Sequence, residues 1–141
     1  MQKIAMIGFG NVGQGLAEIL HAKKAALKRR HGFEYQVVAI SDARLGALHD
    51  PEGLDLGRAL KVLAATGSLA GYRGARVVQG WDALKTIRDS GADVVVELAA
   101  AAGAAKRTLL ARGKARRIVA LERNSTRSRR LAAGLVAAGR R

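Results

Sequence analysis

Residues 4–20 read "IAMIGFGNVGQGLAEIL", and this stretch decides the start of the fold. Lys3–Ile7 is a short apolar run that stops at Gly8, which predicts a buried strand. Asn11–His31 follows with a periodic apolar stripe, which predicts one helix that stops at Gly32. The sequence therefore predicts a strand, a tight glycine turn and a helix in immediate succession.

The turn between these two elements has the spacing G-x-G-x-x-G, formed by Gly8, Gly10 and Gly13. In this context Gly8 permits the tight turn, Gly10 lets a pyrophosphate approach the backbone, and Gly13 lets the helix pack closely. The helix N-terminus adds free N–H groups and a partial positive charge. The turn therefore predicts dinucleotide binding. The alternative is a tight strand-to-helix turn without a ligand.

The end of the second predicted strand, Tyr35–Ile40, carries the residues that would meet the adenosine ribose. An acidic side chain at this place holds the 2′-hydroxyl of NAD, whereas an arginine accommodates the 2′-phosphate of NADP. This chain has both, as Asp42 and Arg44, and the fork of donors on Arg44 favours NADP over NAD. An ordinary surface arginine is the alternative interpretation of Arg44.

The rest of the first 98 residues alternates between helix and strand patterns. Residues 43–57 are expected to form a loop, and Asp82 is expected to cap a helix. The other predicted elements are a helix at Leu54–Ala65, a strand at Val77–Val78, a helix at Ala83–Ser90 and a strand at Ala92–Leu98. This alternation predicts an α/β fold of the Rossmann type, a doubly wound, mainly parallel sheet with helices on both faces.

Residues 99–141 differ in amino-acid composition from the rest of the chain and form a second region. Residues 98–141 hold 12 Lys and Arg against the single acid Glu122, whereas residues 1–97 hold 13 against 10. A fifth strand at Arg117–Leu121 and a last helix at Arg127–Ala138 are predicted. We therefore divide the chain into a dinucleotide-binding domain, 1–98, and an Ala/Arg-rich basic segment, 99–141, which would complete the sheet.

The composition narrows the classes of function. The chain has no cysteine, which excludes disulfides and cysteine-based metal sites and fits the cytoplasm, and no metal ligands are assigned. It has no apolar run of the roughly 18 residues that a membrane span needs. The net charge of +14 invites a nucleic-acid interpretation, but no aromatic residue follows Trp81 to stack bases. We therefore expect neither a membrane nor a specific nucleic acid as partner.

An ordered set of segments resembles the amino-terminal NAD(P)-binding domain of homoserine dehydrogenase, closest to archaeal and short bacterial forms. The set is "KIAMIGFGNVGQGLAEIL", "YQVVAISDAR", "DPEGLDL", "TGSLAGY", "GWDALKTI" and "ADVVVEL", over about residues 2–98. The resemblance implies interconversion of L-homoserine and L-aspartate 4-semialdehyde with NAD(P), in threonine and methionine biosynthesis. It places the region of the adenosine ribose at Asp42 and Arg44. It places the pyrophosphate turn at Gly8, Phe9, Gly10, Asn11, Val12 and Gly13.

The resemblance stops after about residue 98. The family continues with a Thr-Pro turn and an Asn-Lys-Gly-Pro segment with a catalytic lysine, where this chain has "LAAAAGAA" and "ALERNSTRS". Homoserine oxidation needs a proton acceptor and anchors for the substrate's carboxylate and ammonium groups. Glu97 could be considered as a base, but it fits better as a residue of the cofactor cleft or the strand end. No catalytic residue is assigned, and the substrate site and substrate domain are expected to be absent.

Two explanations fit this break. Residues 99–141 are either a genuine basic extension or the product of a shifted reading frame, and the sudden loss of acids and family motifs favours the second. In either case the chain is expected to be inactive alone. If the basic segment does not cover "DVVVEL", exposed apolar surface would cause self-association. Other functional interpretations are a non-enzymatic nucleotide-sensing Rossmann module and, less favoured, a basic nucleic-acid-binding protein.

Overall fold

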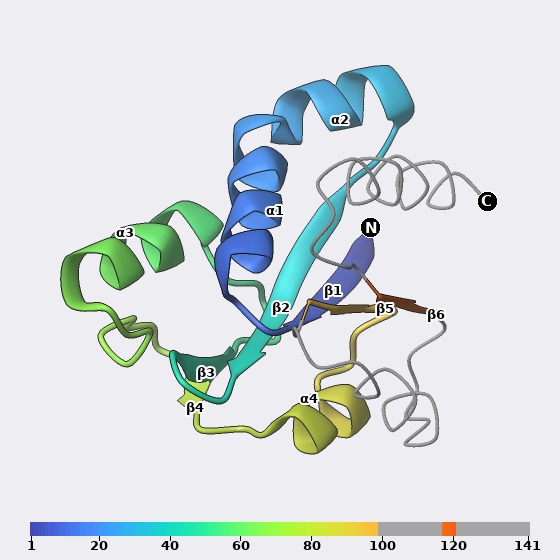
Figure 1. Ribbon diagram of the computed structural model, residues 1–141. Helices are drawn as coiled ribbons and strands as arrows, with labels where there is room; N and C mark the ends of the chain where they lie inside the picture. Colours follow the sequence, from blue (N-terminus) through green and yellow to red (C-terminus); the bar gives the residue numbers. More distant parts are fainter. Residues whose placement is uncertain (99–116, 121–141) are drawn as a thin grey trace.

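The computed structural model describes residues 1–98 and the strand at 117–120 (Figure 1). The described strands form one sheet in the order β4-β3-β2-β1-β5-β6. The strands are β1 (Gln2–Ile7), β2 (Tyr35–Asp42), β3 (Gly46–His49), β4 (Val78–Gln79), β5 (Val94–Glu97) and β6 (Arg117–Ala120). The helices are α1 (Asn11–Ala22), α2 (Lys24–His31), α3 (Leu56–Thr66) and α4 (Ala83–Asp89). The predicted α/β fold of the Rossmann type is confirmed.

Strand β1 lies at the centre of the parallel part of the sheet. It pairs in parallel with β2 on one side and β5 on the other, and β5 pairs in parallel with β6. The strand order therefore runs from β1 to β2 on one side and from β1 to β5 on the other. The point where the two directions part, at the carboxyl end of β1, is a topological switch point, and ligands of such sheets bind there. The strand predicted at Arg117–Leu121 is confirmed as β6.

The other side of the sheet differs from the sequence prediction. The predicted loop 43–57 contains β3, which runs antiparallel to β2, and β4 pairs antiparallel to β3. The strand predicted at Val77–Val78 therefore lies at an antiparallel edge instead of within the parallel ladder. The reason is geometric, because a tight turn after Asp42 returns the chain beside β2, and antiparallel neighbours need only such a short connection.

Helices cover both faces of the sheet, as predicted. Helices α1 and α3 pack side by side on one face, over the larger core cluster, which includes Ile4, Met6 and Val96 (Figure 1). Helix α4 covers the other face, over a smaller cluster that includes Ile7 and Val95. Alternate residues of β1 and β5 thus point to opposite faces, as the two-residue period of a strand requires.

The single helix predicted for Asn11–His31 is interrupted at Lys23, so this prediction is wrong in part. The buried Tyr35 hydroxyl donates a 2.7 Å hydrogen bond to the Leu20 carbonyl, which would otherwise accept from the N–H four residues later. Helix α2 continues beyond the break and has no buried residue. Gly32 ends α2 in a left-handed conformation, as predicted.

The start of α4 follows the predicted chemistry, and α3 begins in the same way. Asp55 caps α3 by accepting from the Arg58 N–H, and Asp82 caps α4 by accepting from the Lys85 N–H. Helix α3 begins two residues later than predicted and α4 ends one residue earlier. The helix predicted at Arg127–Ala138 lies outside the described residues.

Candidate functional site

The glycine turn leaves β1 at the switch point and enters α1 directly. Gly8 has a φ of 91°, in the left-handed region that favours glycine. A Cβ on Gly13 would lie 2.8 Å from the carbonyl oxygen of Gly8, so the turn and the helix touch through backbone alone. Two of the three glycines are therefore required by the protein's own geometry.

Gly10 differs from the other two glycines. Its φ of −73° is open to any residue, and a Cβ placed there would meet no atom of the described residues within 4 Å. Nothing in the described fold therefore demands a glycine at this position. The open space lies where a pyrophosphate would approach the backbone of the motif.

The first turn of α1 lacks an internal cap. Gly10 is its N-cap residue and supplies no side-chain hydrogen bond, and the first turn contains no acidic residue. The main-chain hydrogen bond that opens this helix runs from the Gln14 N–H to the Gly10 carbonyl and is 2.8 Å long. Among the described residues, the N–H groups of residues 11–13 therefore remain available, with the positive end of the helix dipole behind them.

Asp42 holds the glycine turn in place from the end of β2. Its Oδ2 accepts from the Phe9 N–H at 2.8 Å, and its Oδ1 accepts from the N–H groups of Arg44 and Leu45, both at 2.9 Å. Burial alone would raise the pKa of Asp42, but these three N–H donors and the Arg44 charge outweigh burial and lower the pKa. The carboxylate is therefore charged at neutral pH, and it joins the turn to the loop after β2.

The remaining motif residues divide between core and surface. The Phe9 side chain is fully buried in the larger core cluster, and Val12 packs against that cluster. Asn11 is exposed at the start of α1. Phe9 can thus meet a ligand through its backbone only, and its N–H is already engaged by Asp42.

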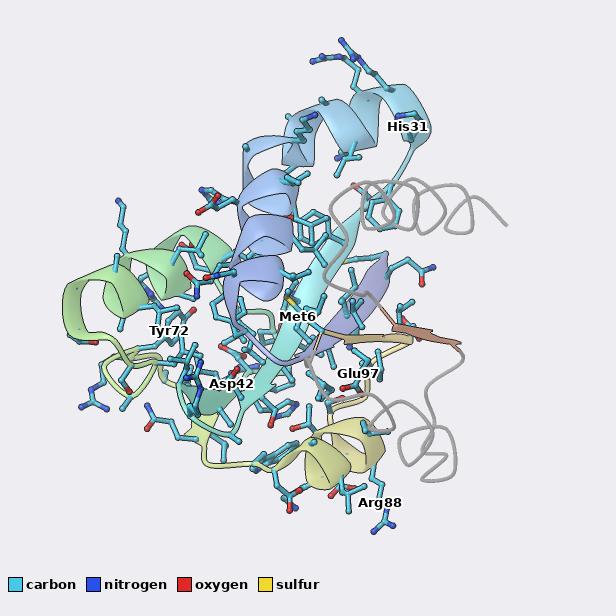
Figure 2. All side chains as sticks on the ribbon, viewed as in Figure 1. Met6, His31, Asp42, Tyr72, Arg88 and Glu97 are labelled. Carbon is cyan, nitrogen blue, oxygen red and sulfur yellow. The ribbon has the colours of Figure 1, made fainter. Side chains whose placement is uncertain are left out.

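Arg44 and Glu97 follow or end the two strands that flank β1, namely β2 and β5. Figure 2 labels Asp42 at the end of β2 and Glu97 at the end of β5. Arg44 is exposed in the turn after β2, two residues beyond Asp42. Glu97 is buried at the end of β5, in register with Ile7 of β1. The structure thus brings the glycine turn and Asp42 together, places Arg44 beside them, and sets Glu97 across β1.

Sequence reasoning missed two residues that fix the turn. The Gln14 side chain donates to the Phe9 carbonyl at 3.0 Å, and the Ser41 carbonyl accepts from the Gly8 N–H at 2.7 Å. Gln14 directly follows Gly13, and Ser41 directly precedes Asp42. These positions next to predicted site residues were the only signal in the sequence that could have found them. Together with Asp42 they hold Gly8 and Phe9 by three hydrogen bonds.

The arrangement suits an elongated anionic ligand. Helix N–H groups are available beside Gly10, and a charged residue of each sign stands at the end of β2. Within the described ranges, no set of three or more His, Cys, Asp or Glu side chains could hold a metal ion. None of the described helices has the length and apolar character needed to cross a membrane.

Comparison with a family model settles the family. The model described as Glutamate/Leucine/Phenylalanine/Valine dehydrogenase matches residues 1–107. The chain belongs to this dehydrogenase family. The match contains the whole glycine turn and the carboxyl end of β2, so it covers the candidate site described above.

Two individual proteins similar to this chain are homoserine dehydrogenases. The chain is 41% identical over 96 residues to homoserine dehydrogenase of Methanocaldococcus jannaschii, covering 67% of this chain and 27% of that protein. It is 33% identical over 97 residues to the NAD(+)-dependent homoserine dehydrogenase of Pseudomonas canavaninivorans, covering 26% of that protein. The predicted resemblance to homoserine dehydrogenase is confirmed, and the chain spans about a quarter of the length of these relatives.

A solved homoserine dehydrogenase structure is also similar to this chain. A hyperthermophilic archaeal homoserine dehydrogenase in complex with NADPH is similar, with a TM-score of 0.57 and 29% identity. The similarity covers 71% of this chain and 29% of that one. The shared portion of the two proteins is therefore of the size of one dinucleotide-binding domain.

Proposed function

We propose that this chain binds a nicotinamide dinucleotide as the NAD(P)-binding domain of a homoserine dehydrogenase. The observation that carries the proposal is the start of α1, where Gly10 leaves space and the first-turn N–H groups lack a cap. A pyrophosphate placed there would accept from these groups and complement the helix dipole. The relative in complex with NADPH supports this proposal.

The cofactor preference follows from the two residues at the end of β2. The Asp42 carboxylate accepts hydrogen bonds from three backbone N–H groups, which occupy three of its roughly four acceptor positions. Little acceptor capacity is therefore left for a ribose hydroxyl. Arg44 is exposed beside it and offers a charged fork to a 2′-phosphate. We therefore propose NADP as the preferred cofactor, with NAD as the alternative.

The reaction of the whole enzyme would be interconversion of L-homoserine and L-aspartate 4-semialdehyde, coupled to NAD(P) in threonine and methionine biosynthesis in the cytoplasm. The bound dinucleotide supplies the hydride chemistry. The described residues of this chain hold and orient the dinucleotide, through the glycine turn and the end of β2. We propose that residues 1–98 perform this role and that the chain does not turn over homoserine alone.

The basic segment 99–141 contributes at least one element, because β6 extends the sheet beside β5. We propose a domain division at residue 98 and a shifted reading frame beyond it. Translating the coding DNA in its other two frames beyond that codon tests the second. Recovery of Thr-Pro and Asn-Lys-Gly-Pro segments is expected, and their absence from both frames would refute the frameshift.

Titration of the purified chain with NADPH and NADH tests the binding proposal, followed by ligand fluorescence. About 0.3 M salt screens loose contacts between the phosphates and the basic residues. Saturable binding is expected, with NADPH the stronger ligand. Gly10→Val is the matched control, since its Cβ would meet no described protein atom within 4 Å and its side chain would occupy the space of the pyrophosphate. Folded wild-type chain that binds neither ligand would contradict the proposal.

A further inference from the structure

The Ser41 residue links the glycine turn to the opposite face of the sheet. Its carbonyl accepts from the Gly8 N–H at 2.7 Å, and its Oγ donates to the Trp81 carbonyl at 2.9 Å. Ser41 is buried, with 6% of its surface exposed. One residue therefore touches the nucleotide turn through its main chain and the segment before α4 through its side chain.

The Trp81 ring continues this connection. It stacks on His49 of β3, with ring centroids 4.2 Å apart and an interplanar angle of 14°. The His49 Nε2 is 3.2 Å from the carbonyl oxygen of Ser90, the residue that caps the C-terminus of α4. The Lys85 ammonium lies 4.8 Å from the centre of the Trp81 ring. Both ends of α4 are thus attached to the same stacked pair.

We propose that Ser41 is a positioning residue that couples occupation of the glycine turn to the stacked pair Trp81–His49. Its Oγ bond fixes the segment before α4, and its carbonyl fixes Gly8, so the two segments share one anchor. A dinucleotide that binds one arrangement of the turn better than another shifts this shared anchor. Trp81 is the only tryptophan of the chain, so its emission reports the coupling directly. This inference rests on the proposed dinucleotide binding.

Two readouts on the same samples test the coupling. Calorimetry measures binding of NADP⁺, and Trp81 emission is recorded in the same titration. The oxidised nucleotide is chosen because it does not absorb tryptophan emission, so energy transfer cannot produce the signal. A saturable change in emission with the calorimetric midpoint is expected. Binding without a change in emission would overturn the coupling alone, whereas absence of binding would overturn the proposed function and the coupling together.

The variant Ser41→Ala removes the Oγ bond and leaves the carbonyl in place. Its affinity is expected to fall about fivefold, the equivalent of one neutral hydrogen bond of about 1 kcal/mol, and its emission response to be lost. Ser41→Thr keeps a hydroxyl and is expected to restore both, which a merely structural role of the side-chain volume would not predict. Wild-type affinity and response in folded Ser41→Ala would overturn the inference, as would a failure of Ser41→Thr to respond.

Discussion

Helices α1 and α3 differ in how the free N–H groups of their first turns are satisfied. Asp55 caps α3 by accepting from the Arg58 N–H at 3.0 Å, so that helix satisfies one of its free donors internally. Gly10 occupies the equivalent place at α1 and offers no side chain. Aspartate is a preferred N-cap residue, and replacing it costs about 1 kcal/mol. Under the proposed function, α1 leaves its donors to the dinucleotide, whereas α3 satisfies one donor with its own cap.

The variant Gly13→Ala should cause the largest change. Its Cβ would lie 2.8 Å from the Gly8 carbonyl oxygen, a backbone atom that cannot move without opening the turn. We expect about 3 kcal/mol less stability in denaturant unfolding, together with loss of dinucleotide binding. Gly15→Ala is the matched control in the same helix, because its Cβ meets nothing within 4 Å among the described residues. That control should gain about 0.5 to 1 kcal/mol; equal losses in both variants would contradict the packing role of Gly13.

The variant Gly10→Asp would give α1 the cap that α3 already has. Stability should rise by up to about 1 kcal/mol, because an acid at the helix start complements the dipole. Dinucleotide affinity should fall at least about a hundredfold, since the carboxylate would occupy the phosphate space and repel its charge. Thermal unfolding and ligand fluorescence measure the two effects separately.

The reverse change at α3 is the control for this variant. Asp55→Ala should lose about 1 kcal/mol of stability and leave dinucleotide affinity unchanged. If Gly10→Asp bound the dinucleotide as wild type does, the free start of α1 would have no role in binding.

Asp42→Asn tests the carboxylate that holds the turn. The amide keeps the size but replaces one acceptor by a donor, which faces backbone N–H groups, so about 2 kcal/mol of stability should be lost at pH 7. The folded-state pKa of Asp42 is lowered, so its contribution is complete above the ordinary value of 3.8 and is lost as pH falls through the folded pKa. The difference between wild type and variant in urea unfolding should therefore shrink below about pH 4. A difference that stays constant down to pH 2 would assign the loss to packing.

The variant Arg44→Ala should cause the smallest change and sharpens the cofactor proposal. Removing one charge-assisted contact to the 2′-phosphate should weaken NADPH binding about tenfold and leave NADH binding within about twofold. Competition between the two ligands on one sample measures the ratio. A parallel loss for both ligands would place Arg44 near a group that NAD and NADP share.

Much of the parallel fold could be predicted because it depends on local patterns. The apolar run before Gly8, the glycine stop at Gly32 and the cap at Asp82 each follow from neighbouring residues. Strand β3 could not be predicted, since its four residues begin with a glycine and its pairing with β2 and β4 depends on the path of the chain after Asp42. The break at Lys23 was also hidden, because it depends on the hydroxyl of Tyr35 from a later strand.

In the candidate site, too, the features set by neighbouring residues could be predicted and those set by distant residues could not. The glycine spacing predicted where the turn lies, and the acid at the end of β2 was found from its position. The three N–H bonds to Asp42 depend on the path of the loop through Arg44 and Leu45, which no local pattern specifies. The second attachment of Ser41, to Trp81, joins residues 40 apart in sequence and required the folded chain.

The most direct test of the unequal helix starts is an NMR titration of the ¹⁵N-labelled chain with NADP⁺ at about 0.3 M salt, where loose charge contacts are screened. We predict that the amide signals of residues 8–13 and 42–45 shift with one common saturation curve. The amide signals at the start of α3, residues 55–58, should move far less, since the Asp55 cap already holds that end. Saturable shifts at the start of α3 without shifts at residues 10–13 would contradict the account.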